Sequence, residues 1–99
     1  MAQYDVYRLP SSEEFALDCQ SDLLSHLDTR FFVPLVPVDI APIPAARLNP
    51  VFCLEGRQYS MVTQFAGSIA ASDLTDRVAS LAEQDLTIGN ALDMLISGF

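Results

Sequence analysis

Residues 80–99 form the stretch Ser80-Leu-Ala-Glu-Gln-Asp-Leu-Thr-Ile-Gly-Asn-Ala-Leu-Asp-Met-Leu-Ile-Ser-Gly-Phe99, which has the most extended helical periodicity in the chain. Its apolar residues recur with the i, i+3, i+4, i+7 spacing of one α-helical face and are Ile88, Ala91, Leu92 and Leu95. We therefore predict a helix that ends the protein and covers its hydrophobic core with this stripe.

Two features of this predicted helix leave alternatives open. Ser80 followed by Glu83 fits a capping box, while Asp85 is a rival N-cap residue. Gly89 inside the helix costs about 1 kcal/mol relative to alanine. Either another element packs closely against the backbone at Gly89, or the helix tolerates a weak point there.

The chain ends in Ile96, Ser97, Gly98 and Phe99 with no polar tail. One interpretation is that Phe99 folds back into the core or into a dimer interface. The other is that this end is a docking tip whose apolar side chains anchor a partner. The pattern alone leaves both open.

Alternating apolar and polar residues predict two β-hairpins. Residues 3–8 and 15–20 are predicted to pair across a polar loop. Residues 51–54 and 58–63 flank Glu55-Gly56-Arg57, a tight connection in which glycine can adopt a positive φ. Strands that precede a C-terminal helix indicate the α+β class.

The apolar run Arg30–Val38 is rich in strand-forming residues, but Pro34 and Pro37 cannot donate a ladder hydrogen bond. We therefore predict an edge strand or a bulge there. The remaining segments are predicted as irregular chain over 39–50, a short strand within 64–72, and one or two helical turns within 73–80.

The length of 99 residues predicts one domain spanning residues 1–99. About half of the residues (51%) are hydrophobic, enough for a core with apolar surface to spare, so we expect a homodimer. No run approaches the roughly 20 apolar residues of a membrane span, and the first residues do not resemble a signal peptide. A cytoplasmic protein is expected.

The chain is strongly acidic, with 13 Asp and Glu residues against five arginines, no lysine, and a net charge of −8. Such a surface repels phosphate backbones, so direct nucleic-acid binding is not expected. A positively charged, disordered partner segment is more compatible.

No catalytic or metal-binding pattern stands out, so we predict a protein that is not an enzyme and carries no cofactor. Cys19 and Cys53 lie in strand-like runs and are expected to be free, buried structural thiols. Together with the lone His26 they do not form a metal site.

Short matches in register along the whole chain resemble one known family. They are Tyr4-Asp-Val-Tyr7, Gln20-Ser-Asp22, Leu23-Leu24, Pro34-Leu35, Pro50-Val51, Met61, Thr63, Asn90-Ala91 and Leu95-Ile-Ser-Gly-Phe99. In this combination the chain resembles the CcdB family, bacterial toxins of toxin–antitoxin pairs that poison DNA gyrase.

The resemblance implies a fold and a mechanism. The fold is an antiparallel, SH3-like or barrel-like sheet of five strands with a smaller sheet and a C-terminal helix, in a homodimer. The mechanism has the C-terminal tips of the dimer enter the gyrase A subunits and trap the enzyme with its DNA cleaved. A CcdA-like antitoxin removes the toxin through a flexible C-terminal segment.

The resemblance also implies gyrase-binding residues, carried over by position. The family's aliphatic pair corresponds to Leu23 and Leu24, and its two helix asparagines correspond to Asn90 and Asp93. Its aromatic-Trp-Gly-Ile ending corresponds to Ile96, Ser97, Gly98 and Phe99. Ser97 replaces the tryptophan that stacks on a gyrase arginine in the family, so Phe99 is the candidate aromatic anchor.

Two other functions stay open at this point. A toxin relic would bind antitoxin without poisoning gyrase, as the missing tryptophan suggests. A ribonuclease, which the related fold also supports, would use Arg30 or Arg57 at the scissile phosphate, but the net charge of −8 opposes RNA binding.

Overall fold

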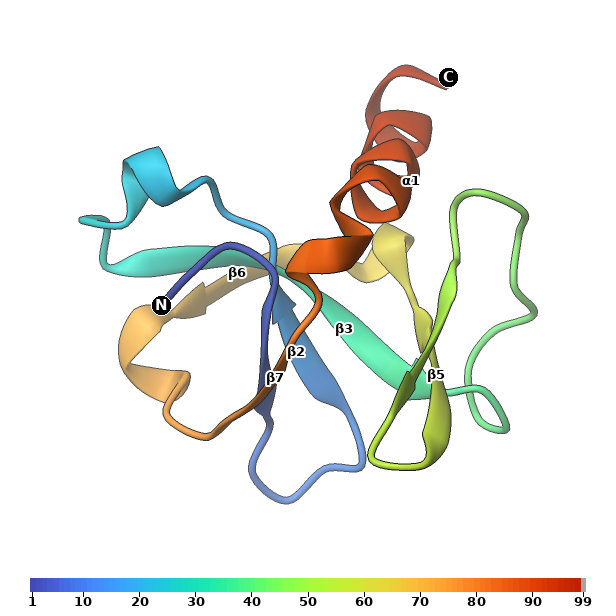
Figure 1. Cartoon of the computed structure of the whole chain (residues 1–99), viewed down its shortest axis with the longest axis horizontal. Helices are drawn as coiled ribbons and strands as arrows, with labels where there is room; N and C mark the ends of the chain where they lie inside the picture. The colour runs from blue at the N-terminus through green and yellow to red at the C-terminus, as the bar shows by residue number, and fades with distance from the viewer. Residues whose placement is uncertain (99) are drawn as a thin grey trace.

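The computed structural model describes residues 1–98, in which β-strands precede a single α-helix (Figure 1). The strands are β1 (Asp5–Arg8), β2 (Phe15–Asp18), β3 (Thr29–Pro37), β4 (Val51–Leu54), β5 (Arg57–Met61), β6 (Gly67–Ala70) and β7 (Arg77–Ser80). The helices are the 3-10 turns η1 (Asp22–Leu24), η2 (Thr63–Phe65), η3 (Ala71–Asp73) and η4 (Ala82–Gln84), followed by α1 (Asp85–Ser97).

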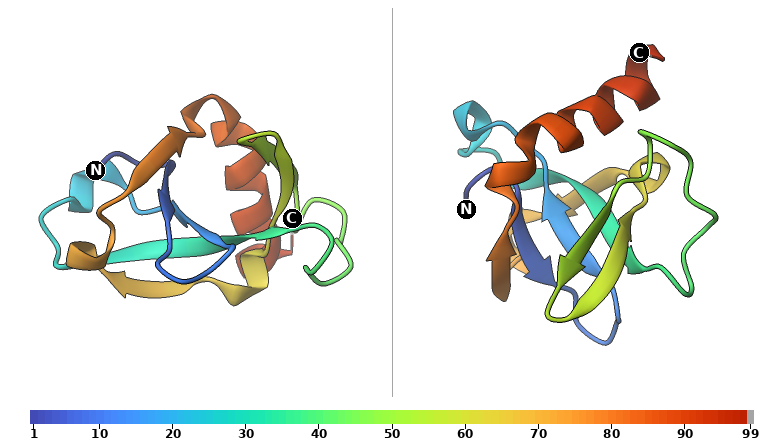
Figure 2. Two further views of the ribbon diagram at one scale, coloured as in Figure 1. Left: turned by 90° about the horizontal axis from the view of Figure 1, so that it is seen from below. Right: turned by 45° about the vertical axis from the view of Figure 1, so that its right-hand side comes forward.

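All strand pairings are antiparallel, and β3 lies at the centre of the sheet. Five strands follow in the order β7-β1-β2-β3-β6, and a smaller group is formed by β3 with β5 and β4. The sheet curls into a half-barrel with α1 across one end (Figures 1 and 2). The α+β class and the barrel-like antiparallel sheet with a C-terminal helix are confirmed, but within residues 1–98 the smaller group is continuous with the other strands in one seven-stranded sheet.

Both predicted hairpins are present. Val6 pairs with Leu17 in the first, and Phe52 pairs with Tyr59 in the second. Glu55 and Gly56 both have positive φ values, 51° and 77°, as in the type I′ turn that matches the twist of a two-residue hairpin.

The prediction of an edge strand at Pro34 was wrong, because β3 pairs on both sides. Residues 29–32 pair with β6 and residues 35–37 with β5, so Pro34 lies where β3 changes partners. The Pro34 carbonyl accepts a hydrogen bond from the Val62 amide at 3.0 Å. In an antiparallel strand the N and the C=O of one residue point to the same neighbouring strand. The N–H that Pro34 lacks would therefore point to the side where β3 changes from β6 to β5 as its partner, so no ladder hydrogen bond is lost there.

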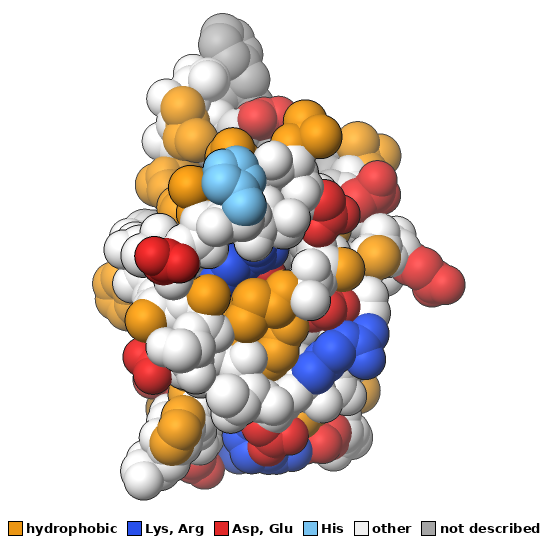
Figure 3. Space-filling model, turned by 90° about the vertical axis from the view of Figure 1, so that its left-hand side faces the viewer, with side chains coloured by type: hydrophobic (Ala, Val, Ile, Leu, Met, Phe, Trp, Pro, Cys, Tyr) orange, Lys and Arg blue, Asp and Glu red, His pale blue; other side chains and the backbone are white. Residues whose placement is uncertain are grey.

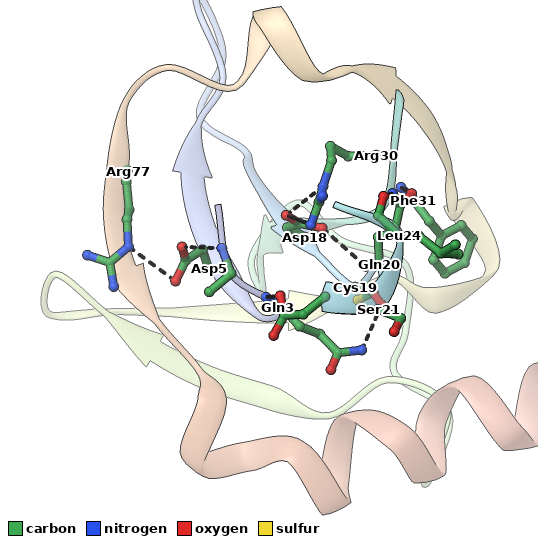
Figure 4. A network of polar contacts seen from close by, with 12 residues as sticks. Gln3, Asp5, Asp18, Cys19, Gln20, Ser21, Leu24, Arg30, Phe31 and Arg77 are labelled. Atoms are coloured by element: carbon green, nitrogen blue, oxygen red, sulfur yellow. Dashed lines mark hydrogen bonds and ion pairs between the residues drawn. The ribbon is translucent and has the colours of Figure 1, made fainter. Parts of the chain in front are cut away.

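The two faces of the sheet bury different cores. The larger core lies under α1 and includes the odd-numbered side chains Phe15 and Leu17 of β2. The opposite face buries a smaller group around Tyr7, Ala16 and Leu74. Strand alternation places Asp18 and Arg30 on this second face, where they form a buried ion pair (Figure 4).

The predicted beginning of the C-terminal helix was wrong. Ser80 ends strand β7, and its Oγ accepts a hydrogen bond from the Ala82 amide, so no capping box forms. Asp85 is the first residue of α1 and accepts from the Leu86 amide, while Gln84 occupies the N-cap position. Residues 73–80 therefore contain the end of η3 and a strand rather than helical turns.

The structure also tests the expectations for the apolar stripe of α1, for Gly89 and for the two cysteines. Only Ile88 and Ala91 of the predicted stripe are fully buried, Leu92 is partly buried, and Leu95 is 42% exposed. Among residues 1–98, no atom outside the neighbouring helix backbone lies within 4 Å of a Cβ added at Gly89, so the helix simply tolerates this residue. Cys19 is buried as expected, but Cys53 is exposed because its side chain points outward from β4.

Candidate functional site

Large apolar side chains are exposed on two elements at the same end of the molecule. Leu23 and Leu24 of η1 are 89% and 45% exposed, and Ile96 near the end of α1 is 75% exposed. Both elements lie away from the β4–β5 turn (Figure 1). Figure 3 shows hydrophobic side chains exposed among carboxylates on the side of the molecule that includes the β2–β3 connection.

The turn η1 is held by polar contacts. Ser21 is its N-cap residue, and the Ser21 Oγ accepts from the Leu23 amide at 3.2 Å. The Gln20 side chain donates to the Leu24 carbonyl at 2.9 Å. No residue of η1 is buried, so both leucines project to solvent.

The N-terminal segment connects η1 with the helical end of the molecule. The Gln3 amide donates to the Asp22 carboxylate at 2.8 Å, and the Gln3 side chain donates to the Cys19 carbonyl at 3.2 Å. Tyr4 packs partly buried against the larger core, and its carbonyl accepts from the Leu81 amide at 2.8 Å. Gln3 and Tyr4 are therefore candidate site residues that the sequence analysis missed.

Two observations mark Tyr4 as unusual. Its φ of 72° is rare for an aromatic residue, since a Cβ crowds the backbone in this left-handed conformation. Burial raises the pKa of the Tyr4 phenol, with further contributions from Cys19 and from the Asp85 and Asp93 carboxylates. The sequence pattern predicted only a strand over residues 3–8, so it carried no signal for the left-handed conformation of Tyr4.

Helix α1 presents Asn90 and Asp93 to solvent, while Ile88 and Ala91 face the core. The family resemblance implied that Asn90 and Asp93 belong to the gyrase-binding surface, and their exposure is compatible with that role. The exposed Leu86 at the beginning of α1 was not predicted as a site residue.

The end of α1 has a specific backbone geometry. Gly98 is the C-cap residue with a φ of 78°, and its amide donates to the Met94 carbonyl at 3.1 Å. Glycine adopts this left-handed conformation without steric cost. Ile96 and Ser97 are exposed before it, whereas Phe99 lies outside the described residues.

The structure thus places the predicted residues in two groups. Gln3 is hydrogen-bonded to η1 beside the first group, and Tyr4 is hydrogen-bonded to Leu81, which precedes the helices of the second group. Leu23 and Leu24 form the first group on η1, and the second group lies along α1. In residues 1–98 these side chains enclose no pocket. The candidate site is an exposed surface suited to binding a macromolecule.

Charges at this surface are unbalanced. Four arginines (Arg8, Arg30, Arg57 and Arg77) each form an ion pair with a carboxylate elsewhere in the chain. Within residues 1–98, none of the ion pairs involves the carboxylates of η1, its loop or the helical end, which are Asp22, Asp28, Glu83, Asp85 and Asp93. The surface is therefore negative, with apolar anchors in it.

The two arginines considered for ribonuclease chemistry are poorly placed for it. Arg30 is only 1% exposed and its guanidinium lies 2.7 Å from the Asp18 carboxylate. Arg57 pairs with both Glu13 and Asp39 at 3.2 Å. Both cations are neutralised by carboxylates, so neither is free to hold a phosphate.

Metal and membrane sites were also considered. In the described part of the chain, no three His, Cys, Asp or Glu side chains come together as metal ligands would. None of the helices found between residues 1 and 98 has the length and apolar character needed to cross a membrane.

A comparison with protein-family models identifies the family of this chain. The model described as CcdB protein matches residues 3–98, nearly the whole chain.

Proposed function

This chain belongs to the CcdB family, whose members are toxins of toxin–antitoxin systems rather than catalytic enzymes, and we propose that it inhibits DNA gyrase through its C-terminal tip. The tip binds the gyrase A subunit and traps the enzyme with its DNA cleaved. The observation that carries this proposal is the uncovered distal half of α1, where Leu95 and Ile96 are 42% and 75% exposed.

The proposed gyrase-binding surface consists of both exposed groups. Leu23 and Leu24 contribute apolar contacts from η1, while Asn90 and Asp93 contribute polar contacts from α1. The tip itself is formed by Ile96, Ser97, Gly98 and Phe99. Phe99 supplies the aromatic anchor in place of the family's tryptophan.

Deletion of residues 97–99 tests this proposal. The shortened protein keeps its fold, because Ile88 and Ala91 lie upstream of the cut. It no longer stabilises the cleaved DNA–gyrase complex in a DNA-cleavage assay with purified gyrase. Ile43→Ala is a matched control, since Ile43 is exposed on the distant 38–50 loop. A folded deletion variant that still poisons gyrase would contradict the proposal.

Replacement of Ser97 by tryptophan gives the complementary test. A desolvated cation–π contact with a gyrase arginine adds roughly 1–2 kcal/mol, which corresponds to about a tenfold gain in affinity. Calorimetry with the gyrase A subunit measures this gain. Unchanged affinity would indicate a different target or docking register.

The alternative is a relic that binds antitoxin without poisoning gyrase, and Ser97 in place of tryptophan favours it. Induced expression in a gyrase-containing bacterium separates the two. Continued growth, combined with binding of a CcdA-like antitoxin, would support the relic.

We further propose that the chain forms a homodimer and binds a cationic, disordered antitoxin segment. Apolar side chains left exposed in one chain support the dimer, and the carboxylates without ion pairs at the candidate site support the cationic partner. Light scattering that shows a monomer at micromolar concentration would exclude the dimer. The affinity for the antitoxin segment is expected to fall as salt increases.

A further inference from the structure

The β2–β3 connection buries few apolar side chains against the rest of the protein. No side chain of residues 22–29 is buried, and even Leu24 and Leu27 are 45% and 42% exposed, so apolar burial fixes η1 to the body only weakly. In a segment with few buried apolar contacts, specific hydrogen bonds provide a larger share of the local stability. The exposed leucines of the candidate site therefore depend on polar contacts for their position.

The Gln20 side chain provides the central contacts (Figure 4). Its Oε1 accepts from the Phe31 amide at 3.0 Å, where the chain returns to the sheet. Its Nε2 donates to the carbonyl of Leu24, the last residue of η1, at 2.9 Å. One amide group thus ties η1 to the first residues of β3.

Gln20 is itself held by the buried ion pair. Its backbone amide donates to the Asp18 Oδ1 at 3.1 Å, while the Asp18 Oδ2 accepts from the Arg30 Nε at 3.0 Å. Both Asp18 and Arg30 are almost completely buried, on neighbouring strands β2 and β3. The two oxygens of one carboxylate therefore join the sheet to the base of the loop.

The chemistry of the position is specific to glutamine. A carboxamide supplies one acceptor and two donor hydrogens on a single group, which matches the Phe31 amide on one side and the Leu24 carbonyl on the other. Glutamate at pH 7 accepts but does not donate, and asparagine is one methylene shorter. Methionine has a similar length without either function.

We propose that Gln20, anchored by the Asp18–Arg30 pair, is a positioning residue that fixes η1 and thereby presents Leu23 and Leu24 to the protein's macromolecular target. Gln20 is only 8% exposed and acts through the Leu24 carbonyl rather than by touching the target. The consequence for binding rests on the proposed gyrase function, whereas the ordering of η1 does not.

Two variants separate the two hydrogen bonds of Gln20. Q20M removes both, and Q20E keeps the acceptor for Phe31 while it loses the donor to Leu24. Q58M is the matched control, because Gln58 is an exposed glutamine on β5. Amide hydrogen exchange by NMR then follows the amides of Leu24 in η1 and of Leu27 just after it, which donate to the carbonyls of Ser21 and Leu24.

We expect both Gln20 variants to speed exchange of the η1 amides at least tenfold, while the strand amides of β1 and β2 stay protected. The Phe31 amide exchanges faster in Q20M and stays slow in Q20E. Unchanged exchange of the η1 amides in Q20E would overturn the proposal. Q20E also decides the question if Q20M fails to fold.

Affinity for the gyrase A subunit is the second readout. We expect Q20E to bind about tenfold more weakly than the wild type and Q58M to bind equally well. Undiminished binding by Q20E would contradict the proposal that Gln20 positions Leu23 and Leu24 for binding. If the wild type itself does not bind gyrase, the proposed target is wrong, and the exchange data still test the positioning of η1.

Discussion

Both halves of α1 carry apolar side chains, but these side chains have different surroundings. In the first half, Ile88 and Ala91 are fully buried against the larger core. In the second half, Met94, Leu95 and Ile96 are exposed as the helix passes beyond the sheet (Figure 2). A continuous apolar pattern thus serves folding in one half and remains available for binding in the other.

The largest expected change in stability comes from a substitution in the first half of α1, which packs on the core. Ile88→Ala removes a fully buried side chain and leaves a cavity under α1, which costs about 2–5 kcal/mol of unfolding free energy. Urea denaturation followed by circular dichroism measures it. A loss below about 1 kcal/mol would mean that the first half is as weakly packed as the second.

The core beneath the packed half also predicts a pH dependence. Burial raises the pKa of the Cys19 thiol from 9.0 to about 12, with a smaller contribution from the Asp18 carboxylate. Between these pH values the unfolded thiol ionises while the folded thiol keeps its proton. The unfolding free energy therefore falls by about 1.4 kcal/mol for each pH unit. The stabilisation is complete below pH 9 and is lost as the pH rises towards 12.

Denaturation curves from pH 8 to 11 test this dependence, with Cys19→Ala as the control that removes the thiol. The decline should be shallower in the variant, although burial also raises the pKa of Tyr7 in both proteins. Equal slopes would show that Cys19 ionises in the folded state.

Cys53 is exposed and should react with a thiol reagent in the native protein, whereas Cys19 should not.

A smaller, stabilising effect is expected where the two halves meet. Gly89→Ala should raise the unfolding free energy by about 0.5–1 kcal/mol, because alanine restricts the unfolded chain and favours the helix. In the described part of the chain, no atom beyond the adjacent helix backbone lies within 4 Å of the added Cβ. Thermal unfolding measures the gain. A destabilised variant would indicate that a second copy packs against the backbone at Gly89.

The smallest effect is expected in the projecting half. Leu95→Ala should change the unfolding free energy by less than about 0.5 kcal/mol, since this side chain is already 42% exposed. The same denaturation experiment as for Ile88→Ala gives a direct comparison. A loss that grows with protein concentration would place Leu95 in a subunit interface and remove the contrast between the halves.

Much of the fold could be predicted because its signals are local. The hairpin of β4 and β5 follows from alternating residues around Glu55-Gly56, which together allow a type I′ turn. The first hairpin follows from the alternation of Phe15 and Leu17. The core contacts of Ile88 and Ala91 follow from helical periodicity.

Part of the candidate site was indicated by the family resemblance rather than by residue types. The resemblance pointed to Leu23, Leu24, Asn90 and Asp93, and the structure exposes all four. It assigned no role to Gln3 or to Gln20, although Gln20 belongs to a matched motif, because their roles depend on carbonyls and carboxylates that only the folded chain brings within reach.

The amino-acid sequence by itself determined the class of fold, the hairpins and the acidic character of this protein, since turns, periodicity and charge depend on neighbouring residues. Tertiary structure alone decided that residues 77–80 form strand β7 rather than a helical turn, because β1 offers that segment a distant hydrogen-bonding edge. It also decided where the core ends along α1. The helix is longer than the sheet beneath it, so identical apolar residues are buried at Ile88 and exposed at Ile96.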